Sequence, residues 1–237
     1  MRIRIKFKKY GVMKFIGHLD IMRYFQKCMR RGNIDIAYSE GFSPHQIMSF
    51  AAPLGVGITS DGEYLDIEVN STKSSEESLK DLNAVMLEGI EITSYRKLGN
   101  SDKKAMSLVA AADYELFIKE NYEVPDVNFE AALEEYFHKP SEILITKQTK
   151  KSEKVMDLKK LVYDFKIRRD ENNRPVFYLH VCTGSTDNLK PELVLSSFYE
   201  YLGLEFHPLS IQIHRIDVYG DINGKFVSLG EMGEIIE

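Results

Sequence analysis

The first residues of the chain alternate strictly between charged and apolar side chains. One face carries four cations and the other three apolar residues, namely Arg2, Arg4, Lys6 and Lys8 against Ile3, Ile5 and Phe7. A period of two is typical of a strand with one buried face. We therefore expect a strand over residues 2–8, whose four cations repel one another unless an anionic group relieves them.

The spacing of apolar residues then changes to steps of three and four, which predicts an amphipathic helix from about His18 to Gly32. Further strands are expected at 34–38, 63–69 and 90–95, and a second helix at 76–87. The resulting order, β-α-β-β-α-β, is that of a ferredoxin-like domain.

The second half of the chain repeats this pattern more loosely. It predicts strands at 113–119, 143–147 and 211–219, a hairpin of 161–168 with 176–182, and helices at 128–137 and 191–202. The expected fold class is α+β, with two tandem ferredoxin-like (βαββαβ) domains and antiparallel sheets. We place the domains at 1–98 and 113–219, a linker at 99–112, and an acidic hairpin or tail at 220–237.

Composition is that of a globular protein, with 43% hydrophobic and 28% charged residues in a chain of 237. The two cysteines, Cys28 and Cys182, have no metal-ligand spacing, so two thiols in a reducing cytoplasm are favoured over a disulfide. The N-terminus has no continuous apolar segment like that of a signal peptide, and no run approaches the length of a membrane span. We expect a cytoplasmic protein with no membrane contact.

Charge is distributed unevenly along the chain. Residues 1–50 hold ten Lys/Arg against three Asp/Glu, although the net charge of the whole chain is −5. This asymmetry favours an anionic partner, such as RNA, for the N-terminal part. The candidate nucleic-acid-binding residues are Arg2, Arg4, Lys6, Lys8, Lys14, Arg23, Lys27, Arg30 and Arg31. In the alternative interpretation, this basic face docks on an acidic surface of its own chain or of a partner protein.

A loop rich in glycine and proline, residues 39–62, separates two strand-like segments and is the second candidate site. Its polar residues lie among apolar ones, which is typical of a loop that a scaffold holds for function. The candidate residues of this site are Ser39, Gly41, Phe42, Ser43, Pro44, His45, Glu63 and Tyr64. The other interpretation, a structural crossover whose Ser and His satisfy backbone groups, stays open.

The same region carries a resemblance to a known family. The segments GHLD and YSEGFSPHQIMSFAAPLGVGITSDGEYLDIEV resemble the radical-SAM-linked protein family, and the match is specific over residues 1–69. Members of that family occur beside, or fused to, a separate radical SAM protein. The resemblance implies a radical SAM protein as partner, without naming a reaction.

Several kinds of chemistry lack their motifs in this sequence. There is no C-x-x-x-C-x-x-C, so an iron–sulfur cluster and its radical chemistry would belong to the partner. Neither a phosphate-binding glycine loop nor a histidine motif for zinc is present. We therefore expect no cofactor and no metal site in this chain.

Three functional hypotheses follow. The first is a non-catalytic accessory module that binds RNA or presents a substrate to a radical SAM enzyme, with Tyr38, Phe42, Phe50 or Tyr64 stacking on bases. For Phe50 a place in the core is favoured. The second is an accessory subunit that contacts only protein.

The third hypothesis is an endoribonuclease. Tandem ferredoxin-like domains with a glycine-rich loop resemble the CRISPR repeat-processing endoribonucleases. That resemblance makes His18 and His45 the catalytic candidates, with Lys6 or Arg23 stabilising charge on the phosphate. A non-catalytic role is favoured over an enzyme.

Overall fold

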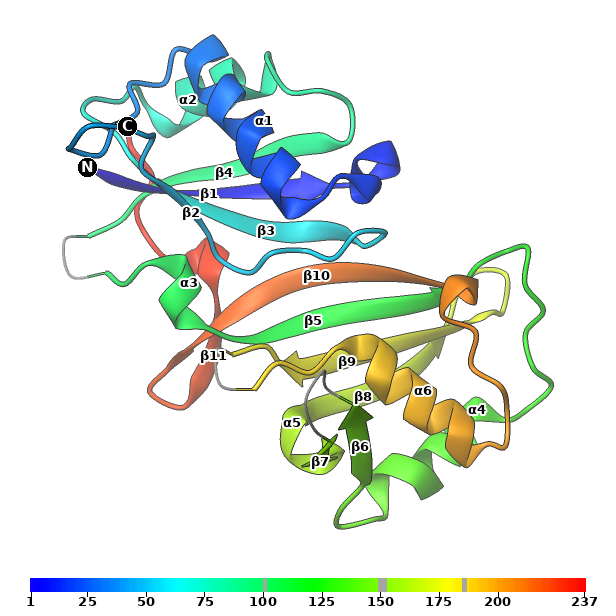
Figure 1. Ribbon diagram of the computed structural model, residues 1–237. Coiled ribbons are helices and arrows are strands. Elements are labelled where there is room, and N and C mark those ends of the chain that lie inside the picture. Colours follow the sequence, from blue (N-terminus) through cyan, green and yellow to red (C-terminus); the bar gives the residue numbers. More distant parts are fainter. Residues whose placement is uncertain (100–101, 149–152, 185–186) are drawn as a thin grey trace. The chain divides into compact units, whose positions relative to one another are not determined.

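The computed structural model of the protein describes residues 1–99, 102–148, 153–184 and 187–237 (Figure 1). The chain forms two compact units. Unit 1 comprises Met1–Ala110 and Arg215–Glu237, and unit 2 comprises Ala111–His214. Both units combine helices with antiparallel strands, which confirms the expected α+β class. No helix in the described part of the chain is long and apolar enough to cross a membrane.

Unit 1 is built on a sheet in which β1 lies between β3 and β4, antiparallel to both. The short strand β2 pairs with β3, and β10 pairs with β11. The elements of this unit are β1 (Arg2–Lys9), α1 (His18–Arg31), β2 (Met48–Phe50), β3 (Thr59–Glu68), α2 (Ser75–Asn83), β4 (Ile90–Lys97), α3 (Ala105–Leu108), β10 (Ile211–Ile222, from Arg215 onward) and β11 (Lys225–Ser228).

Helices α1 and α2 lie together on one face of the β1–β4 region (Figure 1). The buried face of α1 presents Ile21, Phe25 and Met29 to a core that includes Ile5 and Phe7 of β1. The rings of Phe7 and Phe25 lie 4.7 Å apart. The alternation in β1 and the helical spacing in α1 therefore bury the side chains that the sequence analysis expected to be buried.

The expected strand at 34–38 is wrong. Ile36 and Tyr38 form only isolated bridges, to Val69 and Gln46. On the side of β3 away from β1, the strand paired with residues 65–67 is β2, Met48–Phe50. Residues 34–38 lie just beyond it: Ala37 donates its backbone N–H to Glu68 and accepts from Ile47, so this segment has too few successive pairs to form a strand.

The C-terminal segment runs along unit 1 rather than away from it. Beyond the β10–β11 hairpin, Lys97 and Glu234 exchange two backbone hydrogen bonds of 2.8 and 2.9 Å. Further along, Ser75 donates its backbone N–H to the carbonyl of Ile236 at 2.9 Å. Residues 220–237, which the sequence analysis separates as an acidic hairpin or tail, thus form a hairpin and then pair with residues of the N-terminal part.

Unit 2 has β9 between β5 and β8, antiparallel to both, which confirms the expected hairpin of β8 and β9. A separate pair, β6 and β7, forms a two-stranded sheet. The elements are β5 (Val109–Ile118), α4 (Phe129–Leu133) with a π-helical turn Glu134–His138, β6 (Leu144–Gln148), β7 (Glu153–Asp157), α5 (Leu158–Leu161), β8 (Val162–Arg169), β9 (Pro175–Cys182), α6 (Pro191–Tyr201) and β10 up to His214.

The expected linker, 99–112, is largely regular structure. It contains α3 and the first residues of β5. Its residues 100–101 lie outside the described residues.

Gly62 of β3 provides a test of how closely the strands of unit 1 approach. A Cβ at this position would lie 2.6 Å from the Cα of Asp217 and 2.7 Å from the carbonyl oxygen of Ile216. We expect Gly62→Ala to lower the free energy of unfolding by about 1–3 kcal/mol, because backbone would have to move. Denaturant titration measures this change.

Gly17→Ala is the matched control. Gly17 has a φ of −73° and no atom within 4 Å of its Cβ position. Equal denaturant midpoints of unfolding for the two variants would contradict the close approach of the Gly62 backbone to that of Ile216 and Asp217.

Candidate nucleic-acid interface

The cations of β1 are held by groups of their own chain. Arg4 is 2% exposed, and its guanidinium donates to both carboxylate oxygens of Asp66, at 2.8 and 3.0 Å. The two residues face each other in the β1–β3 register. The backbone N–H of Ala105 also donates to Asp66, at 2.7 Å. Arg4 is therefore a buried structural residue.

Lys6 lies in a second polar cluster on the same side of the sheet. Its Nζ is 3.1 Å from Asp217 and 5.5 Å from the centre of the Tyr64 ring. The Tyr64 hydroxyl and the Ser228 hydroxyl both donate to Asp217, the latter at 2.7 Å. Burial and the Asp217 charge raise the pKa of Tyr64, so its phenol stays protonated and keeps this bond.

Two further cations of β1, Arg2 and Lys8, are partly exposed and also have partners. Arg2 donates to the carbonyl of Gly99 at 2.8 Å, and Lys8 lies 3.8 Å from Glu91. The repulsion expected among the four strand cations is thus relieved within the chain. For β1, the structure matches the alternative in which the basic face docks on acidic groups of its own chain.

Glu63, a candidate of the loop site, is buried against Arg215. The guanidinium of Arg215 donates to its Oε1 at 2.8 and 2.6 Å and to the carbonyl of Ala52 at 2.7 Å. Lys9 is buried nearby and donates to the carbonyl of Ile16 at 2.8 Å. Burial lowers the pKa of Lys9, while the Glu63 charge opposes this shift. Glu63 and Tyr64 therefore anchor β3 inside unit 1.

Helix α1 carries the exposed basic residues of the first 50 positions. Arg23, Lys27, Arg30 and Arg31 are all exposed. The first three follow steps of four and three, which places them on one stripe of the helix. Among the described residues, Arg23 of this stripe forms an ion pair with Asp20 at 3.3 Å. Lys14, just before the helix, lies over the ring of Phe15 at 5.3 Å.

The loop at 39–45 is exposed and closed by its own hydrogen bonds. The backbone N–H of Ser39 donates to the carbonyl of His45 at 2.9 Å, and Ser39 Oγ is 2.8 Å from His45 Nδ1. Gly41 has a φ of +107°, which favours glycine there. Phe42, Ser43 and Pro44 are exposed at the tip.

This loop is attached to α1 through Gln46. The Gln46 side-chain amide donates to the carbonyl of Gln26 at 3.1 Å, and Tyr38 bridges to Gln46 at the base of the loop. The structure thus joins two of the predicted sets, the α1 cations and the 39–45 loop. It separates both from Glu63 and Tyr64, which are buried.

The two candidate catalytic histidines have different surroundings. His18 is half-buried and packs edge-on against Phe50, with ring centres 5.3 Å apart. His45 is exposed and bonds to Ser39. Phe50 belongs to the margin of the core, as favoured from the sequence, and packs on Phe7 and Phe25.

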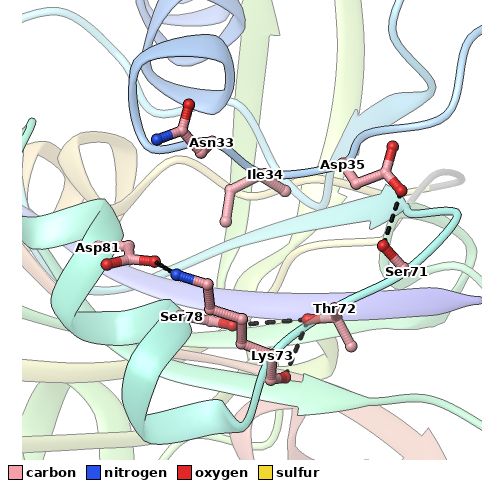
Figure 2. A pocket seen from close by; sticks show the side chains of 8 residues that line it. All are labelled: Asn33, Ile34, Asp35, Ser71, Thr72, Lys73, Ser78 and Asp81. Atoms are coloured by element: carbon pink, nitrogen blue, oxygen red, sulfur yellow. Dashed lines mark hydrogen bonds and ion pairs between the residues drawn. The ribbon is translucent and has the colours of Figure 1, made fainter.

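A polar cavity of about 210 Å³ opens between the end of α1 and α2 (Figure 2). Asp35 accepts a hydrogen bond from Ser71 at 2.8 Å, and Lys73 pairs with Asp81 at 2.6 Å. Hydrogen bonds from Asn70 and Ser71 lower the pKa of Asp35. The remaining lining residues are Asn33, Ile34, Thr72 and Ser78. Lys73 neutralises Asp81, and the Asp35 carboxylate accepts hydrogen bonds from the neutral side chains of Asn70 and Ser71.

Unit 2 contains a polar cluster that the sequence analysis missed. His180 of β9 bonds to Asp113 of β5, its direct partner in the register, and the ring of Tyr163 lies 5.4 Å away. The alternation of Tyr178, His180 and Cys182 with apolar residues in β9 was the available signal. The pairing with Asp113 depends on strand register, which that alternation does not encode.

A family model describes most of this chain. It matches residues 2–191 and represents a family of uncharacterised proteins conserved in bacteria, DUF2344. The chain belongs to this family. No curated protein matches the sequence significantly.

Among solved structures, the chain is similar to the crystal structure of a Cbf5–Nop10–Gar1 complex, with a TM-score of 0.47 and 11% identity. The match covers 91% of this chain and 48% of that chain, so this protein spans about half the length of the matched one. The likeness is too remote to define a function.

The different roles of the basic residues are testable by stability. We expect Arg4→Met to lower the free energy of unfolding by about 3–5 kcal/mol, because it leaves the Asp66 carboxylate buried without its guanidinium. Arg30→Met removes an exposed cation of α1 and should change stability by less than about 0.5 kcal/mol. Urea unfolding of both variants makes the comparison, and similar losses would contradict the division into buried and surface cations.

Proposed function

We propose that this protein is a non-catalytic accessory module that binds RNA through the exposed face of α1. The observation that carries the proposal is the contrast between two sets of cations. Those of β1 are held by Asp66, Asp217, Glu91 and the Gly99 carbonyl. Those of α1 are exposed to solvent, and Arg23, Lys27 and Arg30 lie on one stripe of the packed helix.

A rigid helix suits contacts with phosphate groups. The buried face of α1 is fixed by Phe25 and Met29 in the core, so the positions of the cations on the opposite face are fixed as well. Arg23 and Arg30 are about two turns apart, or roughly 10 Å along the axis. Phosphates of a nucleic-acid backbone spaced along the helix would be contacted by successive side chains.

The proposal includes a finer description of the fold, in which each unit is a ferredoxin-like domain. In unit 1, β3 and β4 are both antiparallel to β1, which lies between them, and α2 connects them. This is a split βαβ arrangement. In unit 2, α6 connects β9 to β10, and β5 lies between these strands. These connections support a ferredoxin-like arrangement in both units, with β2 in place of the strand expected at 34–38 of unit 1.

A radical SAM enzyme as the partner is part of the same proposal. Its support is the resemblance of residues 1–69 to the radical-SAM-linked family, and the module would present RNA to that enzyme. The ribonuclease hypothesis is less favoured, because Lys6 is engaged with Asp217 and His18 packs against Phe50. An accessory subunit that contacts only protein is the competing outcome in the test below.

Charge reversal on α1 tests the proposal. We expect Arg23→Glu, Lys27→Glu and Arg30→Glu together to weaken binding to bulk cellular RNA by at least roughly a hundredfold at low salt, because attraction to phosphates becomes repulsion. Filter retention of labelled RNA measures binding, and circular dichroism checks the fold.

The matched control is Lys103→Glu, Lys104→Glu and Lys225→Glu, which changes the net charge equally at exposed positions outside α1. It should retain most of the binding. An equal loss of RNA affinity in both triple variants would show a general effect of net charge and contradict a specific role of α1. If the parent protein itself binds no RNA, the result favours an accessory subunit that contacts only protein.

A further inference from the structure

The most exposed large apolar side chain in the described residues is Phe42, at the tip of the 39–45 loop, with a relative accessibility of 111%. Its ring has no packing role in unit 1. An aromatic ring held in water is unfavourable, since burial of such a side chain is worth about 1.5–3 kcal/mol. The exposure of Phe42 therefore favours a role in contact with a ligand over a role in the core.

The loop that carries Phe42 is ordered by its own bonds. The backbone N–H of His45 donates to Ser39 Oγ at 3.1 Å, in addition to the two contacts between these residues described above. Gly41 takes the positive φ that the turn requires. A loop closed in this way loses little further conformational entropy when its tip binds a ligand.

The base of the loop is fixed to the basic helix. Gln46 bonds to the Gln26 carbonyl, and Gln26 lies between Arg23 and Lys27 in the sequence of α1. Tyr38, on the other side of the loop base, is also exposed. The aromatic tip and the α1 cations thus belong to one region of unit 1. Glu40 is the one carboxylate in the loop sequence 39–45.

Cations beside an exposed aromatic ring suit a polyanion with accessible flat faces. A single strand offers unstacked bases to such a ring, whereas a duplex keeps its bases stacked and presents mainly phosphates. We propose that Phe42 stacks on an unpaired base, so that the α1 surface and the 39–45 loop select single-stranded RNA over duplex. This inference rests on the proposed RNA-binding function and names the form of RNA that it takes.

The test compares Phe42→Ala with Phe42→Tyr. The probes are a short single-stranded RNA of mixed sequence and the blunt duplex of the same sequence, with binding measured by fluorescence anisotropy. We expect Phe42→Ala to weaken single-strand binding by roughly 5- to 150-fold, the range for loss of one base–aromatic stack. Phe42→Tyr keeps a flat ring and should bind as the parent does, and duplex binding should not change in either variant.

Val56→Ala is the matched control, because it truncates another exposed apolar residue of unit 1. It should leave binding to both probes unchanged. Since the Phe42 side chain is fully exposed among the described residues, all these variants should melt at the parent temperature, which circular dichroism verifies.

The contradicting outcomes separate the two proposals. If Phe42→Ala binds the single strand as tightly as the parent does, while the α1 triple reversal abolishes binding, the stacking inference is wrong and the proposed function stands. Equal weakening on single strand and duplex would also overturn stacking. If the parent protein binds neither probe, the proposed function itself fails.

Discussion

The structure of unit 1 depends on the ion pairs and hydrogen bonds that the polar side chains of β3 make with basic and acidic residues of other strands. Asp66 holds Arg4, Glu63 holds Arg215, and Tyr64 shares Asp217 with Lys6. A charge buried without a partner would cost several kcal/mol, so each of these pairs constrains the strands that carry it. Because the strand cations have these partners, the fully exposed Lys and Arg side chains of residues 1–50 all lie on α1.

The same pairs connect the two ends of the chain. Arg215 and Asp217 belong to the C-terminal part of unit 1, yet they bond to Glu63, Tyr64 and Lys6 in the first 66 residues. The backbone pairing of Lys97 with Glu234 extends this connection along β4. The polar contacts of β1 and β3 are therefore complete only when the C-terminal segment has paired.

Local patterns predicted much of this arrangement. The alternation in residues 2–8, the helical spacing after His18 and the polar turn between 161–168 and 176–182 all led to the observed elements. The strand at 34–38 was wrong, because the pairing of β3 residues 65–67 with β2, and not with 34–38, depends on contacts that a segment's own residues do not encode. The sequence predicts that α1 ends at Gly32. In the structure the residue with the positive φ after the helix is Asn33, and Gly32 has a negative φ.

The candidate site was predicted in part. Glycine and proline marked the 39–45 loop, and charge counting marked α1. Neither signal separates the exposed Arg23 from the buried Arg4, because that difference depends on a partner 62 positions away, Asp66. Glu63 and Tyr64 were grouped with the loop by their nearness in sequence, although their side chains point to partners near the C-terminus.

The most direct test of the account is the salt dependence of RNA binding by the unmodified protein. Contacts from the α1 cations to phosphates should give a plot of log affinity against log salt with a slope of about −2 to −3, from roughly 0.7 per phosphate for a single strand. A dissociation constant that does not change with salt, or no binding even at low salt, would contradict the claim that α1 is a nucleic-acid-binding surface.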